Sequence, residues 1–134
     1  MTSTLAPVMG LPEPGTYADP QRNGLAAKDL LDGLVEHLFY SLGRRVQEAD
    51  RHDLYMALSY AVRDRLMTRY LAGLDAILAS PARVVAYLSA EFLIGPQLGN
   101  NLLMLGIQKE AAEALLQFGI NDIEEILDVE EEPG

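Results

Sequence analysis

The stretch that decides the fold runs from residue 83 to residue 103 and reads R-V-V-A-Y-L-S-A-E-F-L-I-G-P-Q-L-G-N-N-L-L. Its first part, residues 84–88, is continuously apolar and rich in β-branched side chains. A short run of this kind is typical of a strand that is buried on both faces, as in a parallel sheet. A buried helix is the competing interpretation, but the run is too short, and Pro81 just upstream favours a break. The sequence therefore predicts one β-strand over residues 83–88.

Two polar residues, Ser89 and Glu91, follow directly where this predicted strand ends. In open α/β sheets, ligands bind beyond the carboxyl ends of the strands. Glu91 is therefore a candidate for lining a binding pocket. The alternative is an ordinary loop carboxylate, and that is the more common situation of such a residue.

Two helices are expected before the strand. Leucines three and four residues apart predict a helix over residues 25–45. Asp50 should cap a second helix, because Asp53 completes a capping-box pattern, and this helix should continue to about Ala79. The apolar stripe expected along the second helix consists of Leu58, Val62, Leu66, Tyr70, Leu74 and Ile77.

Three shorter helices are expected after the strand. Pro96 suits the first turn of a helix that ends at Gly106. Another helix should span residues 108–118 and stop at Gly119, and Asn121 should cap the last one. The predicted fold class is therefore mainly α with a single β-strand.

Three sets of charged or titratable residues on the predicted helices each allow two interpretations. Crowded charges in the middle of the long helix, from Arg63 to Arg69, could form a solvated face with local ion pairs or a buried structural cluster. His37 has no visible catalytic partner, so a core or surface histidine is favoured over a catalytic one. The acidic residues after 121 lack the calcium-loop pattern D-x-[DN]-x-[DN]-G, which favours a solvated helix face over a metal site.

Composition excludes several classes of function. A formal net charge of −10 disfavours partners such as nucleic acid or an anionic membrane. There is no cysteine, and the two histidines do not have a metal-binding spacing, so no metal site is expected. The sequence contains no long apolar run and no secretory signal pattern, which predicts a cytoplasmic protein. Residues 1–24 are rich in proline and glycine and are expected to form a flexible tail.

Several blocks of the sequence resemble one known family. Y-L-S-A-E-F-L-I-G at residues 87–95, followed by L-G-N-N-L at 98–102, is similar to the first strand and following helix of the α-glucan (glycogen, starch or maltodextrin) phosphorylases. A-V-R-D-R-L-M-T-R-Y at residues 61–70 resembles a further segment of that family. F-G-I-N-D-I-E-E-I-L-D-V-E-E-E-P-G at 118–134 is similar to its acidic stretch, and the resemblance covers roughly residues 28–134.

The resemblance implies that the chain is part of a larger protein. Family members are several times longer and have a two-domain α/β fold of the GT-B-like type. They continue from an E-E-x-G stretch into a glycine-rich loop, Leu-Gly-Asn-Gly-Gly-Leu-Gly-Arg, and their pyridoxal phosphate lysine lies in the C-terminal domain. Residues 25–134 are accordingly identified as an N-terminal helical segment of a phosphorylase, truncated before the glycine-rich loop.

The same resemblance implies a function for the parent enzyme. It would be a homodimer that transfers a terminal glucosyl unit of an α-1,4-glucan to orthophosphate, giving glucose 1-phosphate, with pyridoxal phosphate as cofactor. Glu91 falls at the family's acidic position beside the sugar site, and Leu93 falls where many relatives place a tyrosine near the cofactor ring. No residue here matches a central catalytic role, so the isolated chain is expected to be inactive and to bind no pyridoxal phosphate.

A second hypothesis belongs to another class. The chain could be a free-standing, non-catalytic acidic helical module that is derived from a phosphorylase and interacts with a full-length copy. The DNA that follows the stop codon would discriminate between the two hypotheses, because a parent enzyme predicts the glycine-rich loop there.

Overall fold

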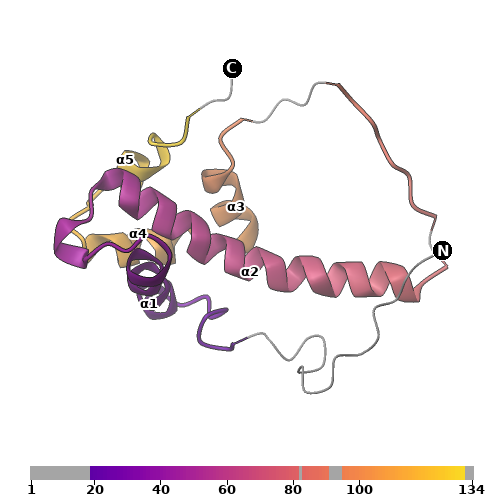
Figure 1. The fold of residues 1–134 in the computed structure, drawn as a ribbon, viewed down its shortest axis with the longest axis horizontal. Coiled ribbons are helices and arrows are strands. Elements are labelled where there is room, and N and C mark those ends of the chain that lie inside the picture. Colours follow the sequence, from indigo (N-terminus) through magenta and orange to yellow (C-terminus); the bar gives the residue numbers. More distant parts are fainter. Residues whose placement is uncertain (1–18, 82, 91–94, 132–134) are drawn as a thin grey trace.

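The computed structural model describes residues 19–81, 83–90 and 95–131, and these are mainly helical (Figure 1). The helices are α1 (Ala27–Glu36), α2 (Arg51–Ala79), α3 (Leu98–Leu105), α4 (Gln108–Leu116) and α5 (Glu124–Leu127). A π-helical turn, His37–Ser41, continues α1, and a short 3-10 turn, Val46–Glu48, leads toward α2. The expectation of a mainly helical chain is confirmed.

The N-terminal half of α2 is the centre of the packing. Helix α1 packs against both α2 and α4, while α3 and α5 also contact α2 (Figure 1). The opposite half of α2 projects beyond the other helices (Figure 1). A single core therefore forms at one end of the long helix.

Side chains from every helix contribute to this core. Its fully buried large members are leucines, isoleucines and one valine, namely Leu30, Leu34, Leu38, Leu58, Val62, Leu102, Ile107, Leu115 and Ile126. Burying one such side chain is worth about 1.5–3 kcal/mol relative to leaving it exposed. These contacts, which join residues far apart in sequence, hold the short helices on α2.

The start of α2 is as the sequence predicts. The amide N–H of Asp53 donates to Oδ1 of Asp50 over 2.9 Å, and the N–H of Asp50 donates back to Oδ2 of Asp53 over 3.3 Å. This reciprocal pair satisfies two donors that a helix start leaves open. The helix then runs for 29 residues to Ala79, which corresponds to roughly 44 Å at 1.5 Å per residue.

The predicted apolar stripe of α2 is buried only in part. Leu58 and Val62 are buried in the core, and Leu66 packs against it. Tyr70, Leu74 and Ile77 are exposed, because no other helix of the described chain reaches that half of α2 (Figure 1). The spacing of the apolar residues identified the packing face of α2, but it did not show how far along the helix other helices cover that face.

The strand predicted over residues 83–88 does not form. Residues 83–89 have no regular secondary structure and follow an arc from the end of α2 toward α3 (Figure 1). The four large apolar side chains of this run are exposed. The prediction was wrong for this chain because a strand needs neighbouring strands to pair its N–H and C=O groups, and none is present in the described residues.

Gly106 caps α3 as expected, whereas α4 already ends at Leu116 and Gly119 closes the turn that follows it. Gly106 and Gly119 have φ angles of 71° and 80°, the left-handed conformation that glycine adopts without steric cost. The expectation that Asn121 caps the last helix is wrong. The N–H of Glu124 instead donates to Oδ1 of Asp122 over 3.1 Å, because α5 begins at Glu124, later than the pattern indicated.

Composition places residues 19–24 in the predicted flexible tail. Among these residues, Arg22, Asn23 and Gly24 are hydrogen-bonded to α2, while the rest of the predicted tail lies outside the described residues.

Within the described chain, even the 29-residue α2 is too polar to serve as a membrane span, and no other helix qualifies.

Candidate functional site

The two site residues predicted from the sequence, Glu91 and Leu93, lie outside the residues that the structure describes. Their roles therefore stay predictions. What the structure adds is a group of polar side chains elsewhere, from the segment before α1, the π-helical turn and α2, in which His37 and Arg65 are buried.

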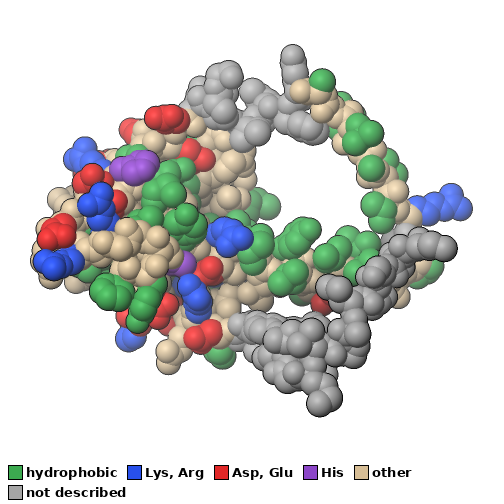
Figure 2. Space-filling view, viewed as in Figure 1, with side chains coloured by type: hydrophobic (Ala, Val, Ile, Leu, Met, Phe, Trp, Pro, Cys, Tyr) green, Lys and Arg blue, Asp and Glu red, His purple; other side chains and the backbone are tan. Residues whose placement is uncertain are grey.

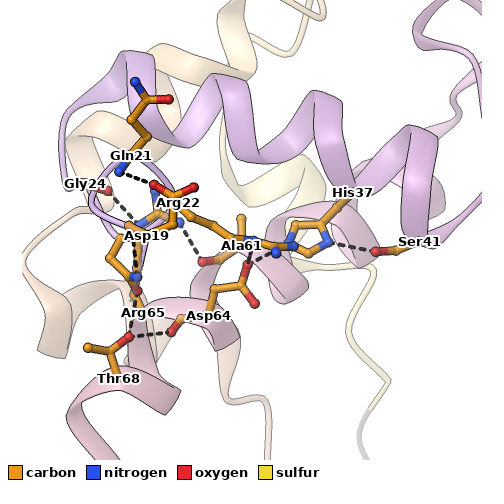
Figure 3. Close-up of polar contacts among 11 residues, drawn as sticks. Asp19, Gln21, Arg22, Gly24, His37, Ser41, Ala61, Asp64, Arg65 and Thr68 are labelled. Atoms are coloured by element: carbon orange, nitrogen blue, oxygen red, sulfur yellow. Dashed lines mark hydrogen bonds and ion pairs between the residues drawn. The ribbon is translucent and has the colours of Figure 1, made fainter. Parts of the chain in front are cut away.

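This group, here called the Asp64 cluster, consists of Arg22, His37, Ser41, Asp64 and Arg65 (Figure 3). The π-helical turn supplies His37 and Ser41, and α2 supplies Asp64 and Arg65. Nε of Arg22 donates to Oδ2 of Asp64 over 2.7 Å, and Nε2 of His37 lies 3.0 Å from the same oxygen. The second ring nitrogen of His37, Nδ1, lies 2.8 Å from Oγ of Ser41.

The partners fix the hydrogen-bonding roles of the neutral imidazole. An ionised carboxylate can only accept, so the Nε2 of His37 that faces Asp64 carries the proton. Nδ1 then accepts from the hydroxyl of Ser41. The ring is buried and stacks on Tyr60, with 5.5 Å between ring centroids. His37 therefore holds the π-helical turn against α2.

The order Ser41–His37–Asp64 resembles a nucleophile with its base and orienting carboxylate. Acyl transfer would also need free N–H donors near the nucleophile to stabilise an oxyanion. The N–H groups that follow Ser41 are already used: those of Leu42 and Gly43 donate to carbonyls of the same turn. The geometry supports a structural role for His37, as a buried histidine that joins the π-helical turn to α2.

Arg65 anchors the segment before α1. Its side chain is 3% exposed, Nε donates to the carbonyl of Gly24 over 2.8 Å, and Nη1 donates to the carbonyl of Ala61 over 2.6 Å. Burial lowers the pKa of Arg65, while the negative charge of Asp64 acts in the opposite direction. The guanidinium group of Arg65 nevertheless stays charged at neutral pH, because arginine is not deprotonated in proteins.

Both interpretations of the crowded charges on α2 therefore apply, to different residues. Arg65 is buried and Asp64 is partly buried in the structural cluster, while Arg63 and Arg69 are exposed. Sequence spacing could not separate them, because the partners Arg22 and His37 come from outside the helix.

We expect an Asp64→Ala variant to lose about 1–3 kcal/mol in free energy of unfolding, because the buried N–H of His37 would have no acceptor. Asp64→Asn keeps an acceptor oxygen and should lose less. The matched control is Asp32→Ala, which removes only an exposed ion pair with Lys28 four residues away and should cost much less. Urea unfolding measures all three, and equal losses for Asp64→Ala and Asp32→Ala would contradict a structural role for the cluster.

Two acidic residues near the C-terminal end make long-range contacts that the sequence did not indicate. Glu125 forms an ion pair with Arg51 at the start of α2. The carboxylate of Glu130 accepts from the N–H of Gln97 over 2.7 Å and from that of Leu98 over 2.9 Å. Both residues stay partly exposed, as a solvated face predicts, but each also has a partner from another element.

One signal for the Glu130 contact does exist in the sequence. Gln97 stands at the cap position of α3 and makes no side-chain capping bond, so the start of α3 needs an acceptor from elsewhere. The identity of that acceptor is not a local property. In the described part of the chain, acidic and histidine side chains do not gather in threes at any possible metal site.

A shallow hollow of about 360 Å³ lies beside the π-helical turn. Its lining residues are Val35, Glu36, Phe39, Tyr40, Arg44, Arg45, Val46 and Gln47. None of these residues belongs to the Asp64 cluster, and His37 is not among them.

Comparison with known proteins identifies the family, although no protein-family profile matches the chain. A glycogen phosphorylase of Synechocystis sp. is 42% identical over 121 residues, which are 90% of this chain and 14% of that protein. The liver form of Homo sapiens is 37% identical over 106 residues, covering 79% of this chain and 12% of that protein. The brain form of Bos taurus is 36% identical over 98 residues, or 73% of this chain and 12% of that protein. The chain belongs to the glycogen phosphorylase family.

The phosphorylase-family chain thus spans only 12–14% of the length of these relatives.

The two lysines of the chain are the residues that could form a Schiff base with a cofactor aldehyde. Lys28 and Lys109 are both exposed and pair with Asp32 and Glu113. The hydrogen bond and charge of Asp32 raise the pKa of Lys28, whereas a lysine that forms a Schiff base is activated by a lowered pKa. Lys28 does not fit that role.

Proposed function

We propose that this chain acts as the N-terminal part of an α-1,4-glucan phosphorylase. The complete enzyme would transfer a terminal glucosyl unit of glycogen, starch or maltodextrin to orthophosphate and release glucose 1-phosphate. The observation that carries the proposal is the 42% identity to a glycogen phosphorylase over 90% of this chain. Because the match covers 14% of that relative, the catalytic and cofactor-binding regions are assigned to polypeptide outside this chain.

Within this proposal Glu91 lines the sugar pocket, where its carboxylate holds water, substrate hydroxyls or neighbouring backbone in place. Leu93 lies near the cofactor ring and offers it apolar contact only. Pyridoxal phosphate supplies, in the complete enzyme, a phosphate group that exchanges a proton with the substrate phosphate. The exposed, paired lysines support the further proposal that this chain alone holds no cofactor.

The partners follow from the same proposal. The complete enzyme binds α-1,4-glucan and phosphate, assembles as a homodimer and works in the cytoplasm. The formal net charge of −10 supports the exclusion of nucleic acid and anionic membranes as partners.

A chimera tests the proposal directly. Residues 28–134 would replace the matching segment of the Synechocystis enzyme, and we expect the folded chimera to release glucose 1-phosphate from glycogen and orthophosphate. Glu91→Gln in the chimera should lower kcat/KM, whereas Glu110→Gln on α4 should not. A folded chimera without activity would contradict the proposal.

The isolated chain is the complementary experiment. With glucan, orthophosphate and added pyridoxal phosphate it should release no glucose 1-phosphate, and borohydride reduction should leave no specific pyridoxyl-lysine. The intact Synechocystis enzyme, assayed in parallel, is the positive control. Turnover by the purified 134-residue chain would show that this segment carries catalytic machinery of its own.

One observation favours the second candidate, a non-catalytic interaction module. The chain closes a hydrophobic core of its own around α1, α4 and the first half of α2. A segment that folds independently can act as a separate subunit. An inactive chimera, together with binding of the isolated chain to an intact phosphorylase, would select this function.

A further inference from the structure

The exposed half of α2 carries an apolar stripe. Five large apolar residues recur at the spacing of one helix face, and they are Tyr70, Leu71, Leu74, Ile77 and Leu78. All are exposed, and Leu78 is 75% exposed. A helix with this pattern normally buries the stripe against another element. Figure 2 shows hydrophobic side chains along this projecting half, with few charges between them.

A second unpartnered apolar segment follows directly. Val84, Val85, Tyr87 and Leu88 are exposed, and Val85 reaches 90%. Figure 2 shows hydrophobic side chains along the arc that these residues form. Because the run has no polar alternation, it suits a position that is covered on both faces. The stripe on α2 and residues 84–88 are together called the open surface.

The two parts of the open surface restrict the partner. The stripe on α2 can be buried only by a partner whose own apolar face packs along this helix. The run at residues 84–88 needs strands on its edges and layers on both faces, as in a parallel sheet covered by helices. A polypeptide with α/β architecture satisfies both needs at once.

A second copy of this chain is the poorer occupant. The described residues of a copy form no sheet that could receive residues 84–88. Each copy also carries a formal net charge of −10, which opposes association. The relatives, by contrast, contain 86–88% of sequence that this chain does not match.

We propose that the open surface binds the remainder of a phosphorylase polypeptide, even when that remainder is supplied as a separate chain. The inference rests on the proposed function and adds the residues and the kind of partner for this surface. The core contains none of the open-surface residues, so the chain can keep its fold while the surface is vacant.

The experiment co-expresses the tagged 134-residue chain with an untagged Synechocystis phosphorylase that lacks the matching segment and whatever precedes it. Complex formation and affinity are measured on the purified pair by sedimentation. Leu78→Glu and Val85→Lys place a charge on each part of the open surface and should weaken binding by about tenfold or more. Met104→Lys is the matched control, since Met104 is 72% exposed on α3, outside the open surface, and its replacement should leave affinity unchanged.

Each outcome decides the proposal. Binding by the wild type that both open-surface variants weaken, and the control does not, supports it. A remainder that stays insoluble, or that does not bind the wild-type chain, overturns the proposal. Binding that all three variants leave intact also overturns it. So does the finding that the chain forms homodimers in place of the complex. Glucose 1-phosphate release by the complex is scored separately: a specific complex without turnover keeps the interface and counts against the proposed function.

Discussion

Replacing Leu58 with alanine is expected to lower the free energy of unfolding by about 2–5 kcal/mol. Leu58 is fully buried on α2, where its side chain joins the core shared with α1 and the later helices. Truncation removes apolar contacts and leaves a cavity that the surrounding side chains fill only partly. A domain is typically stable by about 5–15 kcal/mol, so this loss should be visible as a large shift of the urea midpoint.

The matched control is Leu78→Ala, the same substitution in the same helix at an exposed position. Its effect should stay within about 0.5 kcal/mol, as for most surface substitutions. Similar losses for the two variants would contradict the division of α2 into a core half and an open half.

The isolated chain is expected to self-associate through residues 84–88, weakly in comparison with its binding to a phosphorylase remainder. Exposed apolar residues in an unpaired extended segment are a template for pairing with another chain. Val85→Lys should reduce this association, because Val85 is exposed and a charged lysine on an unpaired edge disfavours pairing with another chain. Sedimentation across a range of concentrations gives the association constants.

Val62→Lys is the comparison, because Val62 is buried in the core and a lysine there should lower the melting temperature. Val85→Lys should reduce association more than Val62→Lys does, while leaving the melting temperature near that of the wild type. A wild-type chain that stays monomeric and melts cooperatively above about 65 °C, beyond the usual mesophile range, would contradict the prediction.

Local signals account for what the sequence alone determined. The capping box of Asp50 and Asp53 fixed the start of α2, and the absence of proline between that point and Pro81 allowed the helix to continue to Ala79. Gly106 and Gly119 ended α3 and the helical turn after α4 because left-handed backbone favours glycine. Leucine spacing identified the faces that pack. The family also followed from sequence blocks, without any knowledge of their structure.

Only the tertiary structure showed which polar groups pair across the chain, and that residues 83–88 do not form a strand. Asp64 meets Arg22 across 42 positions and His37 across 27, and Glu130 reaches the start of α3 across more than 30. Such contacts depend on how helices pack, which no spacing within a helix encodes. The apolar run at residues 84–88 has the composition of a strand, yet it stays unpaired. Helices satisfy their hydrogen bonds within one segment, whereas a strand depends on partners that the described chain does not supply.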